Sequence, residues 1–216
     1  MEQNLSLFET RVLGCLFEKA VTTPDYYPLT SNGLLSACNQ KSNREPVLEM
    51  TDSELQTTLD ELNKKRLVTV ESGFGSRVNK YAHRFCNTEF GELKLSKAEL
   101  AIVCVLFLRG AQTPGELRTR TQRLHEFADV AAVEATLESM AQRATPLVQK
   151  LARQAGKREH RYVHLFSELS DEAVTVGVER EVQAHERTKI AELEQEVSQL
   201  KAQVALLQQQ LANAQA

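Results

Sequence analysis

The sequence predicts a mainly α-helical protein of the α+β class, in which a unit of three helices and a β-hairpin occurs twice before a C-terminal coiled coil. Three observations predict this organisation. A Ser-x-x-Glu capping box, which typically starts a helix, occurs at Ser6 and again at Ser96. A Tyr-x-His-x-Phe strand occurs at residues 81–85 and again at 162–166. Residues 190–211 carry a strict heptad repeat of apolar side chains.

The first unit is predicted to contain three helices, each opened by a Ser or Thr cap. They cover residues 6–19, residues 30–38, and a stretch that starts with a capping box at Thr51 and has Leu55, Leu59 and Leu62 on one face. Residues 67–85 then alternate apolar and polar side chains around a Gly-rich tip at 72–75. This pattern predicts a two-stranded hairpin.

The second unit repeats this order. Its predicted helices start at Ser96, at Thr113 with proline in the first helical position, and at Asp129 with Val133, Leu137 and Met140 facing inward. Gly110 is expected to end the first of them, because glycine tolerates the left-handed conformation of a helix end. Residues 147–166 predict a second hairpin around Gly156.

Three helices followed by a hairpin is the element order of a winged helix-turn-helix, in which the hairpin tip forms the wing. We therefore expect tandem winged helix-turn-helix domains over residues 1–90 and 91–169. Residues 170–189 are expected to form a helical linker, and residues 190–213 a coiled-coil helix.

Two polar segments carry a resemblance to a known family. They are the loop Asn-Gln-Lys-Ser-Asn-Arg-Glu-Pro-Val at residues 39–47 and the stretch Thr-Pro-Gly-Glu-Leu-Arg-Thr-Arg at residues 113–120. With them, residues 5–167 resemble the YceH-type family of uncharacterised bacterial proteins. The resemblance implies a tandem winged-helix fold of the DNA-binding superfamily, and it implies no established function and no assigned site.

The C-terminal heptads predict a homodimer. Leucine at every d position with mainly β-branched residues at a favours a parallel two-stranded coil, and Lys189 with Glu194 and Glu196 with Lys201 would pair across it. A helix of about three heptads is marginal alone, so folding back onto its own domain and antiparallel pairing are the alternatives. The predicted dimerisation residues are Ile190, Leu193, Val197, Leu200, Val204, Leu207 and Leu211.

Charge is distributed unevenly along the chain. The net charge of −3 excludes a uniformly basic protein that coats nucleic acid. Residues 91–166 nevertheless carry 12 basic and 8 acidic side chains, whereas residues 167–216 carry 4 and 9. The predicted phosphate-contacting residues are Arg118, Arg120, Arg123, Arg143, Lys150, Arg153, Lys157, Arg158 and Arg161, with Arg77 and Lys80 beside the first hairpin tip. The alternative is a solvated cationic face that pairs with the acidic tail.

The presumed recognition helices oppose base-specific reading of DNA, because they carry Asp52, Glu54, Asp60 and Glu61 in the first unit and Glu134 and Glu138 in the second. Wing contacts to phosphates would have to supply the affinity. The sequence favours a homodimeric, transcription-associated DNA-binding protein that contacts phosphates mainly through its second domain. The alternative is a protein-interaction scaffold built from winged helices.

The polar loop at residues 39–47 has two interpretations. Arg44 and Glu45 can form ion pairs next to the fixed backbone of Pro46, and Lys41 and Asn43 provide donors, so the loop could bind a partner or an effector. Asn and Ser also commonly satisfy the backbone of turns, so the loop is at least as well explained as a cap for the second and third helices.

Catalytic motifs are missing from the sequence, which contains no Gly-rich phosphate loop, no H-E-x-x-H and no G-x-S-x-G. We expect no enzyme, no cofactor and no metal site. The equivalent His83 and His164 are expected to be structural, and the four widely spaced cysteines, Cys15, Cys38, Cys86 and Cys104, to be buried thiols.

The longest apolar run, residues 100–108, is far shorter than the ~20 residues that span a bilayer. We expect it to be buried in its own domain or, alternatively, between domains or subunits. The N-terminus carries no secretion signal, so a cytoplasmic protein without membrane contact is expected.

Overall fold

The computed structural model describes residues 4–71, 78–89, 91–153 and 159–167. All of these belong to one compact unit that ends at Leu169. The predicted linker and the coiled-coil seam, 170–189 and 190–213, lie outside the described residues. So do both hairpin tips, with the predicted phosphate-contacting Arg77, Lys157 and Arg158.

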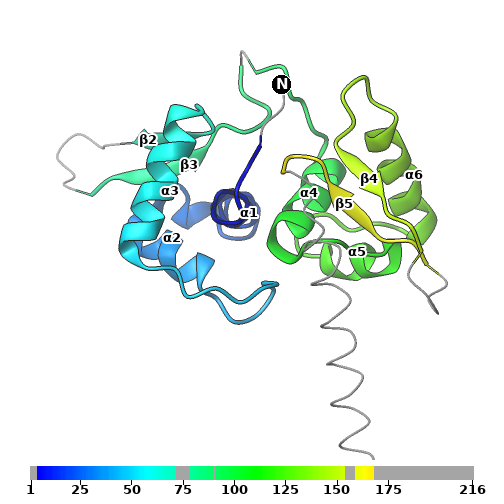
Figure 1. The fold of residues 1–216 in the computed structure, drawn as a ribbon, viewed down its shortest axis with the longest axis horizontal. Coiled ribbons are helices and arrows are strands. Elements are labelled where there is room, and N and C mark those ends of the chain that lie inside the picture. The colour runs from blue at the N-terminus through cyan, green and yellow to red at the C-terminus, as the bar shows by residue number, and fades with distance from the viewer. Residues whose placement is uncertain (1–3, 72–77, 90, 154–158, 168–216) are drawn as a thin grey trace, which may run out of the picture. The chain divides into compact units, whose positions relative to one another are not determined.

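Residues 4–89, here called the first repeat, contain helices and a small antiparallel sheet (Figure 1). The elements are α1 (Leu7–Thr22), the 3₁₀ helix η1 (Pro24–Tyr26), β1 (Leu29–Thr30), α2 (Ser31–Cys38), α3 (Asp52–Lys64), β2 (Val68–Glu71) and β3 (Lys80–His83). The sheet has the strand order β1-β3-β2. Its register places Tyr81 opposite both Leu29 and Val70.

Residues 91–167, here called the second repeat, have the same order of elements. They are α4 (Lys97–Arg109), α5 (Pro114–Arg120), α6 (Val130–Ala141), β4 (Val148–Lys150) and β5 (Tyr162–His164). A single bridge between Gln112 and Tyr162 takes the place that β1 has in the first repeat. The chain is thus a mixed α+β protein with small antiparallel sheets.

The helix starts follow from local hydrogen bonds, and the predicted starts are confirmed. Complete capping boxes open four helices, at Ser6, Thr51, Ser96 and Thr113. The side chains of Thr30 and Asp129 accept from the backbone three residues on. Helix α1 continues beyond Lys19 to Thr22, and α4 ends before Gly110, whose φ is +70°.

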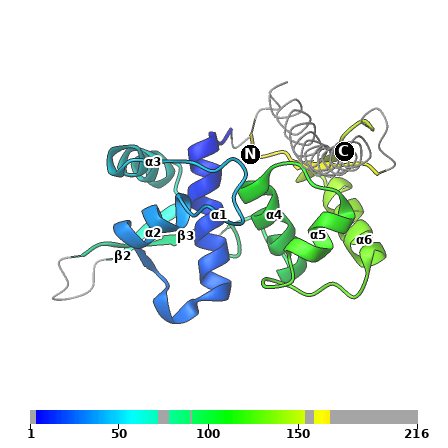
Figure 2. The same ribbon diagram turned by 90° about the horizontal axis from the view of Figure 1, so that it is seen from below.

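Helices α1 and α4 lie side by side and join the two repeats (Figure 2). Gly14 permits the close approach, since a Cβ atom there would lie 2.8 Å from the Leu108 side chain. The Cys104 thiol donates to the Gly14 carbonyl at 3.4 Å. The apolar run at 100–108 therefore packs against α1 of the first repeat as well as against α6 and β5 of the second. Burial within the second repeat was thus only part of the outcome, and the alternative of burial between the repeats also applies.

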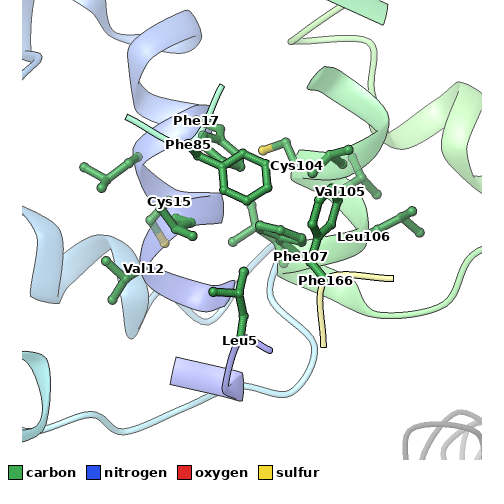
Figure 3. Close-up of a cluster of buried hydrophobic side chains, with 14 of the residues drawn as sticks. Leu5, Val12, Cys15, Phe17, Phe85, Cys104, Val105, Leu106, Phe107 and Phe166 are labelled. Atoms are coloured by element: carbon green, nitrogen blue, oxygen red, sulfur yellow. The ribbon is translucent and has the colours of Figure 1, made fainter. Parts of the chain in front are cut away.

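An aromatic cluster fills the space between the repeats. Phe17 and Phe85 of the first repeat meet Phe107 and Phe166 of the second, with ring centroids 5.0 to 5.8 Å apart (Figure 3). The Leu5 backbone N–H donates to the Phe166 carbonyl at 2.8 Å. One continuous hydrophobic core therefore serves both repeats.

Candidate nucleic-acid interface

The predicted phosphate-contacting residues of the second repeat lie on or beside α5, α6 and the hairpin. Arg118, Arg123, Lys150 and Arg153 are exposed. Side chains of Arg120, Arg143 and Arg161 are only partly accessible, at 26%, 31% and 13%. The described part of the predicted cationic face therefore consists of two groups that differ in exposure.

Four of these arginines are ion-paired with carboxylates of the same compact unit. Arg143 lies 2.5 Å from Glu99, and Arg123 lies 3.3 Å from Glu18 of the first repeat. Arg120 and Arg161 lie 3.4 Å and 4.0 Å from the two oxygens of Glu116. These pairs neutralise much of the positive charge that the sequence concentrates in this region.

The remaining basic side chains have different surroundings. Arg118 donates to the Ala128 carbonyl at 3.2 Å, and the Arg153 side chain donates to the His160 ring at 2.9 Å. Lys150 on β4 and Lys80 on β3 are exposed and have no ion pair with any residue that the structure describes. Of the predicted phosphate-contacting residues that the structure describes, these four are the ones that a phosphate could reach without displacing a carboxylate.

The exposed faces of α3 and α6 are acidic, as the sequence indicates. Helix α3 exposes Asp52, Glu54, Asp60 and Glu61, and α6 exposes Glu134 and Glu138. The Thr51 backbone and hydroxyl donate to the Glu54 carboxylate and hold the pKa of Glu54 below its usual value. Both helices therefore present negative charge to the solvent.

Hydrogen bonds hold the loop at residues 39–47 in place, which agrees with its interpretation as a structural loop between the second and third helices. The Asn39 side chain accepts from the Met50 backbone at 2.8 Å and donates to its carbonyl at 2.7 Å, which closes the loop. The Glu45 backbone N–H donates to the Leu108 carbonyl at 2.8 Å. The loop thus connects α2 with α3 and also ties the first repeat to the end of α4.

Arg44 of this loop forms a buried ion pair. The Arg44 side chain is inaccessible to solvent and lies 2.7 Å from the Glu18 carboxylate. Burial opposes the charge on Glu18, but the hydrogen bonds and the charge of Arg44 outweigh it and keep the pKa of Glu18 below its usual range. The sequence indicated that Arg44 and Glu45 can form ion pairs, but it did not identify Glu18 as a partner.

Sequence reasoning missed Arg11. This arginine is fully buried in α1, and it donates to the Cys38 carbonyl at 3.1 Å and to the Pro46 carbonyl at 2.5 Å. Burial lowers its pKa. The available signal was its spacing, because Arg11 lies three residues after Phe8 and four before Cys15, and residues at these distances share one face of a helix.

His83 and His164 occupy equivalent places in the two repeats. Each ring meets a phenylalanine edge to face, Phe17 or Phe107, at a centroid distance of 4.8 Å. Burial lowers the pKa of each histidine to about 4, and the buried Nδ1 atom of each has no hydrogen-bond partner. These surroundings support the predicted structural role.

The two histidines make stability depend on pH. The unfolded chain binds protons at both imidazoles below pH ~6.5, whereas the folded chain binds them only near pH 4, so stability falls as the pH falls across this interval. We expect the free energy of unfolding to decrease by about 2 kcal/mol per histidine between pH 7.5 and 5, measured by urea denaturation. His83→Gln should remove about half of this dependence. An unchanged pH dependence in that variant would show that the low pKa of His83 is not one of its sources.

The other expectations concern metals, thiols and membranes. Across the described ranges, no group of three or more His, Cys, Asp and Glu side chains is arranged to hold a metal ion. All four cysteines are buried free thiols, which confirms that prediction. Among the helices within residues 4–167, none has the length and apolar character needed to cross a membrane.

Comparison with known proteins identifies close relatives. The profile of the family described as "Protein of unknown function, DUF480" matches residues 5–157. The chain is 55% identical over 211 residues to a UPF0502 protein of Shewanella frigidimarina, with 94% of this chain and 97% of the relative covered. It is 56% identical over 209 residues to a UPF0502 protein of Serratia proteamaculans, with 96% and 97% covered. A UPF0502 protein of Pectobacterium carotovorum is 55% identical, with 96% and 99% covered.

Proposed function

The chain belongs to the DUF480 family of UPF0502 proteins, and within it we propose that it acts as a tandem winged-helix adaptor that binds another protein. The element order of each repeat supports the winged-helix assignment, since a helix, a short strand or bridge, two helices and a hairpin follow one another twice. The heptads at residues 190–211 support a homodimer.

The charge of α3 and α6 carries this proposal. In a DNA-reading winged helix with this element order, the helices at these positions would enter the major groove. Their exposed faces carry the six carboxylates described above, from Asp52 to Glu138. Phosphates would be repelled by these faces, whereas a basic protein surface would be attracted to them.

The ion pairs of the second repeat support the same conclusion. Arg120, Arg123, Arg143 and Arg161 each have a carboxylate within 4.0 Å, so contact with DNA phosphates would compete with existing pairs. The packing of α1 on α4 holds the two repeats, with α3 and α6, in one compact unit.

DNA binding through phosphates is the second candidate. The exposed Arg118, Lys150, Arg153 and Lys80 favour it, because none of them is paired with a carboxylate among the described residues. The sequence adds Arg77, Lys157 and Arg158 to this candidate, and these three residues lie outside those that the structure describes. Such a protein would contact the DNA backbone without reading bases.

Affinity capture from the lysate of a related bacterium tests the adaptor. We expect a protein that is enriched on the full chain and lost on the charge-reversed variant Asp60→Lys/Glu61→Lys. Glu89→Lys/Glu92→Lys is the matched control, because these carboxylates are also exposed but lie outside α3, and it should retain the partner. Quantitative mass spectrometry of the three samples measures the difference.

Fluorescence anisotropy with a mixed-sequence DNA duplex tests the second candidate. The adaptor proposal predicts no binding at about 50 mM salt. Binding that falls a thousandfold or more between about 50 and 200 mM salt would indicate ~6 to 10 phosphate contacts and would replace the adaptor with the DNA-binding candidate.

A further inference from the structure

Two of the four buried thiols lie in contact with each other. Cys15 lies in the middle of α1, and Cys38 is the last residue of α2. Both residues are fully buried, and the Cys38 thiol donates a hydrogen bond to the Cys15 sulfur. The two sulfur atoms therefore meet where α1 packs against α2. We call Cys15 and Cys38 the helix thiol pair.

Two buried arginines lie beside the helix thiol pair. Arg11 precedes Cys15 by four residues, so both lie on one face of α1, and Arg11 donates to the Cys38 carbonyl at 3.1 Å. Arg44 donates to the carbonyl of Ala37, the residue before Cys38, at 3.0 Å. These bonds hold both guanidinium groups near the two sulfur atoms, where their positive charges favour an anion.

The positive charge of Arg11 lacks a carboxylate partner. Arg44 is paired with Glu18 at 2.7 Å. Arg11 instead donates to backbone carbonyls, and it forms no ion pair with a carboxylate among the described residues. Its buried Nε atom has no hydrogen-bond partner. A thiolate on Cys15 would supply the negative charge that Arg11 lacks, and neighbouring arginines are the surroundings that stabilise a thiolate.

The two thiols differ in their readiness to ionise. Burial opposes the ionisation of Cys15, but the hydrogen bond from Cys38 and the charges of the two arginines outweigh it and lower the pKa of Cys15. The same hydrogen bond, together with burial, raises the pKa of Cys38. Because the thiolate is the nucleophilic form, Cys15 is the attacking group, and Cys38 is the thiol that keeps its proton.

We propose that the helix thiol pair is a redox-sensitive site that hydrogen peroxide converts to a disulfide between α1 and α2. The Cys15 thiolate attacks one peroxide oxygen, the O–O bond breaks, and the leaving hydroxide takes up a proton to become water. Cys15 is then a sulfenic acid. The Cys38 sulfur attacks the Cys15 sulfur, an S–S bond forms, and the S–O bond breaks, so that hydroxide leaves with the Cys38 proton as water. The two thiols lose two electrons, and the peroxide gains them.

Peroxide reaches the helix thiol pair through the end of α2. Cys38 is the last residue of a helix of only eight residues, and helix ends open at a lower free-energy cost than the middle of a packed helix. The disulfide would tie this end of α2, and the loop that follows it, covalently to α1. The site is independent of the proposed adaptor function, because it uses none of the carboxylates of α3 and α6.

Peptide mapping of the full chain after treatment with hydrogen peroxide tests this site. Thiols that remain are alkylated in denaturant, and mass spectrometry identifies the linked peptides. We expect a disulfide between Cys15 and Cys38 that dithiothreitol reverses. Cys38→Ser should instead leave a sulfenic acid on Cys15, which dimedone labels. Cys86→Ser is the matched control, because Cys86 is also buried but burial raises its pKa to about 11, and this variant should form the disulfide like the unchanged chain.

Two outcomes would overturn the proposal. If the unchanged chain yields both Cys15 and Cys38 as alkylated thiols under conditions that oxidise free glutathione, the pair is inert. A disulfide between Cys15 and Cys104 would also contradict it, because the second thiol would then not be Cys38. The Cys104 thiol donates to the Gly14 carbonyl at 3.4 Å, next to Cys15, so this pairing is the direct competitor. Neither outcome affects the adaptor, which capture with the α3 variants tests separately.

Discussion

Arg44→Met is expected to lower the free energy of unfolding by about 3–5 kcal/mol. The substitution keeps much of the side-chain volume but leaves the buried Glu18 carboxylate without its closest partner, at 2.7 Å in the intact chain. It also removes the donor to the Ala37 carbonyl, which lies 3.0 Å from Arg44 Nε. Urea denaturation at pH 7.5, followed by circular dichroism, measures the change.

A double variant separates the cost of the isolated charge from the cost of lost packing. Arg44→Met/Glu18→Gln removes the uncompensated carboxylate, so it should recover a large part of the stability lost in Arg44→Met. A loss below about 1 kcal/mol in the single variant would show that Glu18 finds adequate compensation from Arg123, 3.3 Å away.

Phe107→Ala should lower the free energy of unfolding by about 3–5 kcal/mol as well, for an apolar reason. The Phe107 side chain is 3% exposed and contacts aromatic rings of both repeats, with centroids 4.8 to 5.8 Å away. Its truncation opens a cavity in the middle of the shared core. Thermal unfolding and urea denaturation both report the loss.

Two controls define the size of this effect. Phe107→Leu retains an apolar side chain and should cost clearly less than the alanine variant. Tyr26→Ala removes an aromatic ring that is 78% exposed and should change stability by no more than about 0.5 kcal/mol. If Phe107→Ala costs no more than Tyr26→Ala, the aromatic cluster does not hold the repeats together.

The predicted elements were accurate where a few neighbouring residues decide the structure. The capping boxes at Ser6, Thr51, Ser96 and Thr113 all form. Buried leucines line α3 at the predicted spacing, and Gly110 ends α4 with a positive φ. The two-residue strand β1 was not predicted, because so short a segment carries no alternation and is defined only by its pairing with β3.

The candidate site was predicted less well than the fold. The sequence located a cluster of arginines in the second repeat, but ion pairs occupy four of them. Glu18 and Arg123 are separated by 105 positions in the chain, and Arg109 and Glu45 by 64. No local pattern identifies such partners, and the same applies to the buried Arg11 and Arg44.

The sequence by itself determined the order of the helices and of the hairpin strands, the starts of the helices and the acidic faces of α3 and α6. These features depend on hydrogen bonds and side-chain spacing within a turn or two of the backbone. Only the tertiary structure decided that α1 packs on α4 and that the loop at residues 39–47 covers a buried ion pair. It also decided that Arg109 and Arg120 both lie near the Glu45 carboxylate. The physical reason is that these contacts join segments far apart in the chain, and their energies depend on burial and distance, which exist only after the two repeats share one core.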